Sequence, residues 1–423
     1  MAQLSDDCFA FGGELMRAGE ARAILDQRTT VIADTESVPL AAACGRILAE
    51  DLVAERDVPP HDNAAVDGYA VWFDDLDTQN PTRLPVTGRV PAGWPLDHPV
   101  ARGEAIRIFT GAPMPGGAHG GSGPDTVLMQ EDCSLEADTV VIPPGIAQGA
   151  NRRFAGEDLA QGQTVLSAGR RLRAQDIGLA ASLGRTELAV RTPLRVAVFS
   201  TGDEVIEPGQ PLPSGAIYDS NRYSLHGLVG GLGCAVTDLG ILPDRADTIC
   251  EALKEAARDH DLIMTSGGVS TGEEDHVRAA LEGHGALHVW RLAIRPGRPL
   301  ALGQFGRVPF VGLPGNPVAV IVTFLCFARP LILRLAGAAD REPTRFPVPA
   351  DFDYRKKQGR REWLRATLAT GRDGALCARK AGKSGAGILS STARADGLIE
   401  LDEESSGVAA GEAVDFIPFS EFA

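Results

Sequence analysis

A glycine-rich stretch that also carries acids, TSGGVSTGEEDHV (residues 265–277), has the residue types needed to bind a phosphorylated ligand with a metal ion. Its backbone N–H groups attract oxyanions, whereas its consecutive carboxylates Glu273, Glu274 and Asp275 repel them. A hard cation such as Mg²⁺, bound between a carboxylate and a phosphate, removes this conflict. The candidates are Ser266, Gly267, Gly268 and Ser270 for the oxyanion and Asp275 for the metal. A solvated acid cluster that favours the dipole of the next helix is an equal alternative.

Two other loops carry charged groups. TGDE (201–204) puts Glu204 just beyond a predicted strand, where a carboxylate can meet a ligand or metal, or simply cap a turn. RLAIRPGRP (291–299) spaces three arginines around a Pro-Gly turn, at Arg291, Arg295 and Arg298. Guanidinium groups suit bidentate contacts to phosphate and other oxyanions, so this spacing favours an anion pocket over separate surface charges. Neither the P-loop signature nor G-x-G-x-x-G occurs in the glycine-rich stretch.

A fourth loop, in GLPGNPVAV (312–320), joins a predicted strand to a helix that begins near Pro317. The helix N-terminus adds partial positive charge, and the same residues also suit a purely structural turn. Two upstream stretches, PPHDNAAVDGYAV (59–71) and NRRFAGEDL (151–159), carry acids and arginines that alone indicate a tight loop and a surface ion-pair cluster. The basic run YRKKQGRREW (354–363) is interpreted as a solvated strand face.

The elements that must position these loops alternate between strand and helix from 195 to 336. Strands are predicted over 195–200, 235–242, 261–265 and 286–294 and in LALGQF and VPFVGLP; helices are predicted over 220–232 and 244–259 and in VRAALEG. This order predicts a doubly wound, largely parallel sheet with helices on both faces. Ligands bind at the carboxyl ends of such strands, so the loops 201–204, 242–244, 266–275 and 295–299 should gather at one edge.

The rest of the chain predicts smaller domains. Residues 57–155 are rich in Pro, Gly and short strand-like segments, and helical stretches at 12–29 and 174–184 flank them. Strand-like segments return after Pro343. We therefore expect four parts: a discontinuous N-terminal helical and linker domain (1–56 and 156–194), an inserted β-rich domain (57–155), the α/β domain (195–343) and a C-terminal β-domain (344–423).

Length, charge and cysteine content indicate a multidomain protein that does not bind nucleic acid or anionic membranes broadly. With 423 residues the chain exceeds one ordinary core, and its net charge of −15 argues against broad binding to nucleic acid or to an anionic membrane. Seven cysteines without a CxxC pair are typical of reduced thiols in the cytoplasm. We expect no secretory leader, because the start lacks a basic region followed by an apolar one. The apolar run 318–328 is shorter than the ~18 residues of a membrane span, so it predicts a buried helix.

Nine motifs in order resemble the MoeA family, the molybdopterin molybdenumtransferases, which includes the E-domain of gephyrin. They are PPHDNAAVDGYAV, IFTGAPMPGGA, NRRFAGEDL, STGDEVIEPG, IYDSNRYSL, TSGGVSTGEEDHV, RPGRPLALG, GLPGNPVAV and SSTARADGLI, and the match runs from about 10 to 420. The resemblance implies an elongated homodimer in which a MogA/MoaB-like α/β domain is central and the last domain is a β-barrel. It also implies the last step of molybdenum cofactor biosynthesis: insertion of molybdate into adenylylated molybdopterin, with release of AMP and with Mg²⁺ required.

The same resemblance implies a set of site residues, divided in the family between one subunit's central domains and the other's N-terminal domains. Catalytic roles would fall to Asp62, Thr110, Asp158, Glu204 and Asp275; substrate binding to Ser266, Gly267, Gly268, Ser270, Arg291, Arg295, Arg298, Pro314 and Pro317; and Mg²⁺ to Asp244 and Asp275. Three features depart from the family. Arginines replace the usual lysines at 291, 295 and 298, the 118–125 loop is longer, and Arg152 replaces an aliphatic residue.

Two alternatives from other classes remain at this point. A gephyrin-type carrier or scaffold would bind molybdopterin without inserting metal, but the acidic residues expected of the enzyme are all present. An adenylyltransferase of the MogA type would not need the additional N- and C-terminal domains. Partners implied by the resemblance are a MogA-type adenylyltransferase and molybdoenzyme apoproteins, with no nucleic acid and no membrane. Molybdate and tungstate are equally compatible with the sequence, since they are alike in size and charge.

Overall fold

The computed structural model describes residues 15–116, 122–268, 276–281, 284–371, 374–382 and 385–422. Ser270, Asp275 and residues 118–121 of the 118–125 loop lie outside these residues. The chain forms two compact units, each described here by itself. Unit 1 comprises Met1–Ala49, Ala168–Arg173 and Leu188–Ala423, and unit 2 comprises Glu50–Ser167 and Ala174–Glu187.

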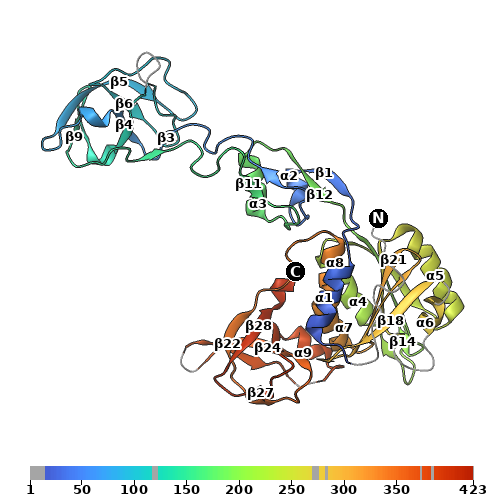
Figure 1. The fold of residues 1–423 in the computed structure, drawn as a ribbon. Helices are drawn as coiled ribbons and strands as arrows, with labels where there is room; N and C mark the ends of the chain where they lie inside the picture. The colour runs from blue at the N-terminus through green and yellow to red at the C-terminus, as the bar shows by residue number, and fades with distance from the viewer. Residues whose placement is uncertain are drawn as a thin grey trace. The chain divides into compact units, whose positions relative to one another are not determined.

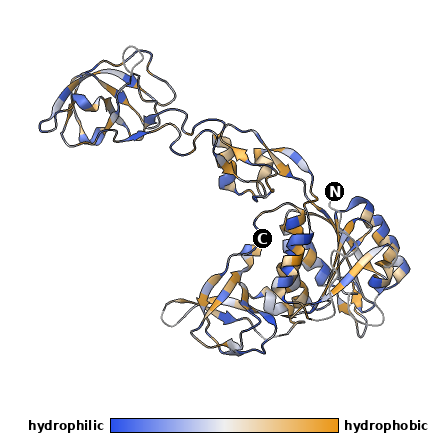
Figure 2. Cartoon of the chain, in the orientation of Figure 1, coloured by the Kyte–Doolittle hydropathy of each residue, from blue (hydrophilic) through white to orange (hydrophobic). Residues whose placement is uncertain are grey.

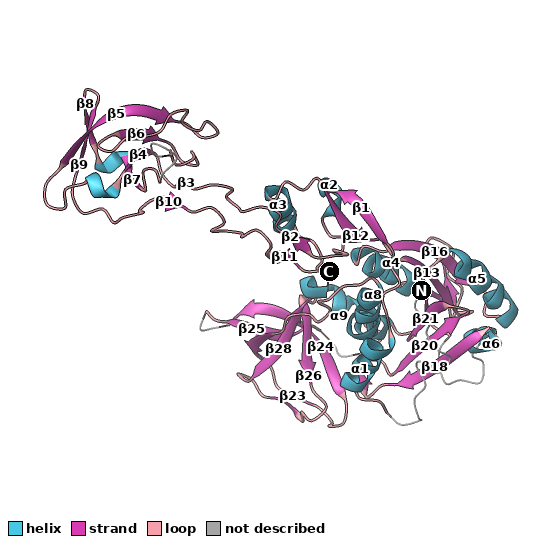
Figure 3. Cartoon of the chain, turned by 45° about the horizontal axis from the view of Figure 1, so that its top comes forward, coloured by secondary structure: helices cyan, strands magenta, loops and turns pink. Residues whose placement is uncertain are grey.

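The central sheet of unit 1 has six strands in the order β16-β13-β17-β21-β20-β18, most of which Figure 3 labels. These strands are β13 (Arg195–Thr201), β16 (Ala235–Leu242), β17 (Leu262–Ser266), β18 (Gly285–Arg291), β20 (Pro299–Phe305) and β21 (Val308–Leu313). The first four in the sheet are parallel, and β20 and β18 add antiparallel neighbours at one side. The largely parallel sheet predicted from the sequence is thereby confirmed, and β13, β17 and β21 all end at the same edge.

Helices cover both faces of this sheet (Figure 1). On one face lie α1 (Ala18–Arg28), α4 (Asn221–Gly231) and the long helix after β21; on the other lie α5 (Ala246–Asp259) and α6 (His276–Leu281). The sequence explains this placement, because α5 buries Ile249, Leu253 and Ala256 at helical spacing and exposes its charged residues. Both colours of the hydropathy scale therefore appear on the helices in Figure 2.

The predicted buried helix at 318–328 is confirmed. It belongs to α7 (Pro317–Thr323), a π-helical turn η4 (Phe324–Ala328) and α8 (Arg329–Leu335), which together run from Pro317 to Leu335. By length and composition alone this helix could cross a membrane, but 83% of its most apolar window is buried inside the protein. It packs against the central sheet as a core helix.

The C-terminal part of unit 1 is a second sheet, in the order β19-β24-β26-β28-β22 with β25 on the other side of β24 (Figure 3). Its strands are β19 (Ile294–Arg295), β22 (Phe346–Pro349), β24 (Arg361–Thr370), β25 (Leu376–Lys380), β26 (Gly397–Leu401) and β28 (Ala413–Pro418).

A bridge between Ala350 and Ala378 brings β22 and β25 together. Strand β19 comes from the arginine-rich turn of the central part, so it joins that turn to the second sheet.

Shorter elements complete unit 1. They are β1 (Thr35–Pro39) paired with β12 (Glu187–Arg191), α2 (Leu40–Ala43), β14 (Val205–Ile206) paired with β15 (Ile217–Tyr218), β23 (Tyr354–Arg355) paired with β27 (Gly407–Val408), α9 (Leu389–Ala393) and η5 (Phe419–Phe422).

Unit 2 is rich in short strands, as the sequence predicts for this part of the chain. Its main sheet has the order β7-β4-β6-β5-β9-β8, and its buried core includes Tyr69, Ile106 and Val127. These strands are β4 (Gly68–Val71), β5 (Thr82–Val90), β6 (Ala105–Ile108), β7 (Thr126–Met129), β8 (Ser134–Glu136) and β9 (Thr139–Ile142), with η1 (Phe73–Asp75) and η3 (Gln130–Asp132) between them. Two strand pairs, β3 (Asn63–Ala64) with β10 (Arg152–Arg153) and β2 (Leu52–Val53) with β11 (Thr164–Leu166), and the helix α3 (Ala174–Ser182) complete it.

Candidate active site

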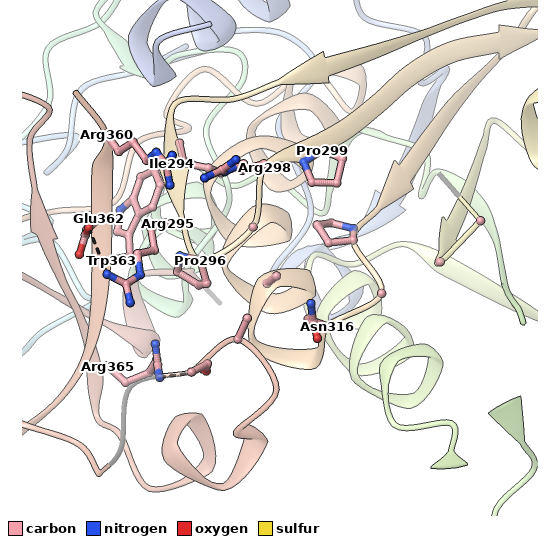
Figure 4. A pocket seen from close by; sticks show the side chains of 18 of the residues that line it. Ile294, Arg295, Pro296, Arg298, Pro299, Asn316, Arg360, Glu362, Trp363 and Arg365 are labelled. Carbon is pink, nitrogen blue, oxygen red and sulfur yellow. Dashed lines mark hydrogen bonds and ion pairs between the residues drawn. The ribbon is translucent and has the colours of Figure 1, made fainter. Parts of the chain in front are cut away.

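A cavity of about 760 Å³ lies in unit 1, where the central strands end and the C-terminal sheet begins (Figure 4). The predicted residues that line it are Glu204, Asp244, Gly267, Gly268, Arg295, Arg298 and Pro314. They follow β13, β16, β17, β18 and β21, so the loops expected at one edge of the sheet do gather there. Arg291, the last residue of β18, is not among the residues that line this cavity.

The glycine loop after β17 supplies backbone to the cavity wall. Gly267 and Gly268 have φ angles of +89° and +64°, a region that favours glycine. A Cβ on Gly268 would lie 2.6 Å from the Cγ2 of Thr201 and 2.7 Å from the Cγ2 of Val277, so a larger residue cannot fit without movement. The loop can therefore present bare main chain at this wall.

Ser266 has a different position from the two glycines. Its side chain is buried, its hydroxyl donates to the carbonyl oxygen of Pro314 over 3.3 Å, and it accepts a hydrogen bond from Asn221. Ser266 and Pro317 line a smaller adjoining hollow of about 70 Å³, while Pro314 is buried under the main cavity. Of the predicted oxyanion group, Gly267 thus lines both hollows, Gly268 lines the main cavity and Ser266 lines only the smaller one.

Four arginines line the cavity, and only two of them were expected. Arg295 and Arg298 lie on the Pro-Gly turn, whereas Arg365 lies on β24 and Arg360 directly precedes this strand (Figure 4). The parallel pairing of β19 with β24 places Arg295 beside Glu362. Because of this pairing, the residues of β24 next to Glu362 also line the cavity. The interpretation of 354–363 as a solvated face is wrong here, because Glu362 and Trp363 are 3% and 1% exposed.

Arg365 is the most deeply placed of these cations. It is 6% exposed, and its guanidinium donates to the Oγ of Ser391 over 3.1 Å and to the carbonyl oxygen of Gly385 over 3.3 Å. Burial, and then the nearby charge of Arg295, lower the pKa of Arg365 from its ordinary value. A positive charge in such surroundings is stabilised by a bound anion. The sequence signal was an arginine inside an apolar strand, WLRAT, which the pattern of the surrounding basic run concealed.

Glu362 opposes these cations from the same strand. It accepts a hydrogen bond of 2.7 Å from the hydroxyl of Tyr354 and lies 3.6 Å from Arg295. Burial, with the contact to Glu362, raises the pKa of Tyr354 to about 12, so this phenol stays protonated near neutral pH. Arg295 keeps 56% of its side chain exposed in spite of the ion pair. It can therefore contact a ligand in the cavity.

The acidic side of the cavity fits a hard cation in part. Glu204 and Asp244 both line it, and Asp244 accepts a hydrogen bond of 3.2 Å from the hydroxyl of Thr201. Within the described residues, no three acidic, histidine or cysteine side chains form a metal-binding group. Mg²⁺ is commonly held by only one or two carboxylates together with substrate phosphates, so this donor set suits it. The expected second ligand, Asp275, lies outside the described residues.

The three remaining predicted residues lie in unit 2, where Asp62 is tightly bound. Arg152 donates to its Oδ2 from Nε over 2.9 Å and also from Nη2, and the N–H of Ala155 donates to Oδ1 over 2.7 Å. Burial opposes ionisation of Asp62, but the contacts with Ala155 and Arg152 prevail and lower its pKa. The arginine that departs from the family pattern is therefore the ion-pair partner of a predicted catalytic acid.

Thr110 and Asp158 lie near the same strand pair, β3 with β10. The N–H and the hydroxyl of Thr110 both donate to one oxygen of Asp67, each over 2.8 Å, and these bonds lower the pKa of Asp67. Asp158 is exposed, and its N–H donates to the carbonyl oxygen of Val58 over 3.1 Å. In unit 2, Asp62 thus contacts the 151–159 loop, and Thr110 contacts Asp67 of the 59–71 loop.

Comparison with known families and proteins gives a consistent result along the chain. The MoeA N-terminal region (domain I and II) matches residues 16–184, the "Probable molybdopterin binding domain" matches 197–334, and the MoeA C-terminal region (domain IV) matches 347–419. The molybdopterin molybdenumtransferase of Haemophilus influenzae is 38% identical over 96% of this chain and 99% of its own length. That of Nostoc sp. is 37% identical over 90% of this chain and 88% of its own.

A solved structure extends the similarity to the fold. The crystal structure of a molybdopterin biosynthesis MoeA protein from Pyrococcus horikoshii superimposes with a TM-score of 0.81 at 32% identity, over 96% of this chain and all of that one. Three findings therefore point to the same family. All three family regions match, the relatives align over most of their length, and the fold is shared. The chain belongs to the MoeA family.

Proposed function

We propose that this chain is a molybdopterin molybdenumtransferase, which inserts molybdate into adenylylated molybdopterin and releases AMP. The observation that carries the proposal is the cavity of unit 1, in which a glycine loop faces four arginines. Such a site suits a substrate with a phosphoanhydride together with a second, tetrahedral oxyanion. The relatives named molybdopterin molybdenumtransferase support it.

The arginines would bind the oxyanions. Arg365 is buried and oriented by Ser391 and Gly385, so a dianion near it meets a charge that is already fixed in place. Arg298 and Arg360 form no ion pair with any described residue, so their charges are available to a ligand. Molybdate is the cargo of the reaction, and these residues would hold it beside the dithiolene of the pterin.

The glycine loop would orient the phosphates. Gly267 and Gly268 line the cavity with their main chain, and Asn316, which directly precedes the helix α7, lines it as well. Holding both oxyanions in one cavity converts their reaction into an effectively unimolecular step. No nucleophilic side chain is required, because positioning and charge stabilisation can carry phosphoanhydride cleavage.

Mg²⁺ is part of the proposal as a cofactor. Asp244 and, outside the described residues, Asp275 would hold it, with Glu204 close by. When bound, the ion would neutralise phosphate charge and polarise the phosphoanhydride. Equilibrium binding of adenylylated molybdopterin should then weaken when the ion is chelated, and Asp244→Asn should reduce that dependence on the ion.

A homodimer in the cytoplasm is proposed as the working form, on the strength of the resemblance. Predicted site residues lie in both compact units, and in the family the two sets come from different subunits. Mixing an Asp62→Asn subunit with an Asp275→Asn subunit should restore part of the activity, since one site of the heterodimer is then wild type. Purified heterodimers without any recovery would rule out a shared site. A MogA-type adenylyltransferase and molybdoenzyme apoproteins are the proposed partners.

The decisive experiment is incubation of the purified protein with adenylylated molybdopterin, molybdate and Mg²⁺, with AMP and molybdenum cofactor measured. AMP should appear only when molybdate and Mg²⁺ are both present, and tungstate in place of molybdate tests the choice of oxyanion. A protein that binds the adenylylated ligand but never releases AMP under these conditions is a carrier, which would contradict the proposal.

A further inference from the structure

Asn221, the first residue of α4, forms hydrogen bonds with two loops of the cavity wall. Its amide nitrogen donates to the Oγ of Ser266 over 2.9 Å and to the carbonyl oxygen of Gly315 over 2.7 Å. A carbonyl oxygen can only accept, so the nitrogen of the amide must face Gly315. Both N–H bonds of the amide are then used, one for the loop after β17 and one for the turn before α7.

The connection continues through Ser266. This serine is 3% exposed, accepts from Asn221, and donates its own proton to the carbonyl oxygen of Pro314 over 3.3 Å. The next residue, Gly267, donates its N–H to Leu313 over 3.2 Å. A chain of hydrogen bonds therefore links α4, the end of β17 and the end of β21; it is buried at Ser266 and exposed at Gly315. Hydrogen bonds in such a network reinforce one another.

Asn221 is itself held in place by its neighbours. Its own N–H donates to Asp219 over 3.1 Å, and the next residue, Arg222, donates to Asp219 over 3.0 Å and to Asp238 and Glu207. The side chains of Arg222 and Asp219 are 4% and 2% exposed. This ion cluster fixes the start of α4, so the amide loses little further freedom when it binds the two loops.

Asn221 lies outside the set of residues that line the large cavity, whereas the loops it joins contribute Gly267, Gly268, Gly315 and Asn316 to the wall. We propose that Asn221 is a positioning residue for the transfer reaction: it sets the spacing between the glycine loop and the Pro-Gly-Asn turn, and so the place of the phosphates. The inference rests on the proposed function for its effect on catalysis. The link between the loops stands on the contacts alone.

The test compares three variants with the wild-type protein. Asn221→Ala removes both donors, and Asn221→Asp keeps the size but puts a carboxylate against the carbonyl of Gly315. Ser224→Ala is the matched control on the same helix, because its hydroxyl bonds only to the carbonyl oxygen of Ser220, one turn before. Hydrogen exchange is measured on peptides covering 262–268 and 313–318, and AMP release is measured at saturating and limiting substrate.

Both Asn221 variants should raise exchange in these two segments and leave the C-terminal sheet unchanged. Their kcat should fall about 10- to 100-fold with KM changed less than threefold, since a misplacement of about 1 Å costs that much in rate. Ser224→Ala should stay within twofold in every measurement. Asn221→Ala combined with Ser266→Ala should lose less than the product of the single losses, because both act through one chain of bonds.

The outcomes separate the two proposals. A wild-type protein that releases no AMP refutes the proposed function, and the exchange data then still test the link between the loops. With an active wild type, an Asn221→Ala protein whose kcat stays within twofold overturns the positioning role. A rise in exchange spread over the whole of unit 1 overturns it as well, because it shows general destabilisation.

Discussion

The cavity of unit 1 and the acidic loops of unit 2 both contain residues expected in the active site, but their charges are arranged differently. In unit 2 two acids of these loops have a close partner: Asp62 is bound by Arg152, and Asp67 accepts hydrogen bonds from Thr110. In the cavity, Arg298 and Arg360 form no ion pair with the described residues. A paired charge is a fixed part of the scaffold, whereas an unpaired cation in a hollow is available to an anion.

The largest effect should come from Arg365. Replacing it by alanine removes a buried charge and up to two hydrogen bonds to a bound oxyanion, each worth about 1.5–3 kcal/mol. Molybdate affinity should fall roughly 100-fold or more. Arg379→Ala is the control, because Arg379 is an exposed arginine of the same sheet that pairs with Asp351. Calorimetric titration with molybdate checks both variants. If Arg365→Ala binds molybdate as tightly as wild type does, Arg365 has a structural role, like the paired charges of unit 2.

Arg295 should matter less, because it already has a partner in Glu362 at 3.6 Å. We expect Arg295→Ala to weaken molybdate binding about tenfold, the equivalent of one charge-assisted hydrogen bond. Arg295→Lys should recover most of the loss, since it keeps the charge. Adding Glu362→Gln to the alanine variant should also recover part of it by removing an opposing charge. If Arg295→Ala binds molybdate as wild type does, Arg295 belongs with the paired charges.

The ion pair of Arg152 with Asp62 tests the paired charges of unit 2, and its effect is expected on the free energy of unfolding. Interactions of Asp62 depress its pKa in the folded state, so their stabilisation is present above the unfolded pKa of about 3.9 and is lost as pH falls through the lower folded value. Arg152→Leu should cost about 1 kcal/mol at pH 7. Exchange at the N–H of Ala65, which donates to Asn151, should rise about fivefold. The difference from wild type should shrink below pH 4, and a difference independent of pH would disprove the role of the ion pair.

The smallest effect is expected for Tyr354→Phe. This change removes one hydrogen bond to Glu362 and leaves the arginines in place. Glu362 then attracts Arg295 more strongly, so molybdate binding should weaken by about two- to fivefold. Because the pKa of Tyr354 is about 12, wild type and variant should keep the same ratio of affinities from pH 6 to 9. A ratio that changes within this range would show that another group titrates here.

The sequence predicted the central part of the fold well and its contact with the C-terminal sheet poorly. Alternation of apolar strands with amphipathic helices is local, so β13, β16 and α5 lie where the pattern places them. The gathering of loops at one edge follows from parallel topology alone. The approach of Arg365 depends on the pairing of β19 with β24, which joins segments far apart in the chain. The ion pair of Asp62 with Arg152 depends likewise on β3 pairing with β10. No local pattern contains either register.

Strand β19 is only two residues long, yet it fixes the register of β24 against the arginine-rich turn, through the pairs Ile294 with Arg361 and Arg295 with Glu362. Side chains of a strand alternate between its faces, so a shift by one residue would exchange them all. A single insertion or deletion in the turn at 356–360 would shift this register, and Arg365, which now donates to Ser391 and Gly385, would exchange faces with Leu364, which packs in the C-terminal core. The length of this turn is therefore under stricter constraint than its composition, and engineering of the C-terminal sheet has to preserve it.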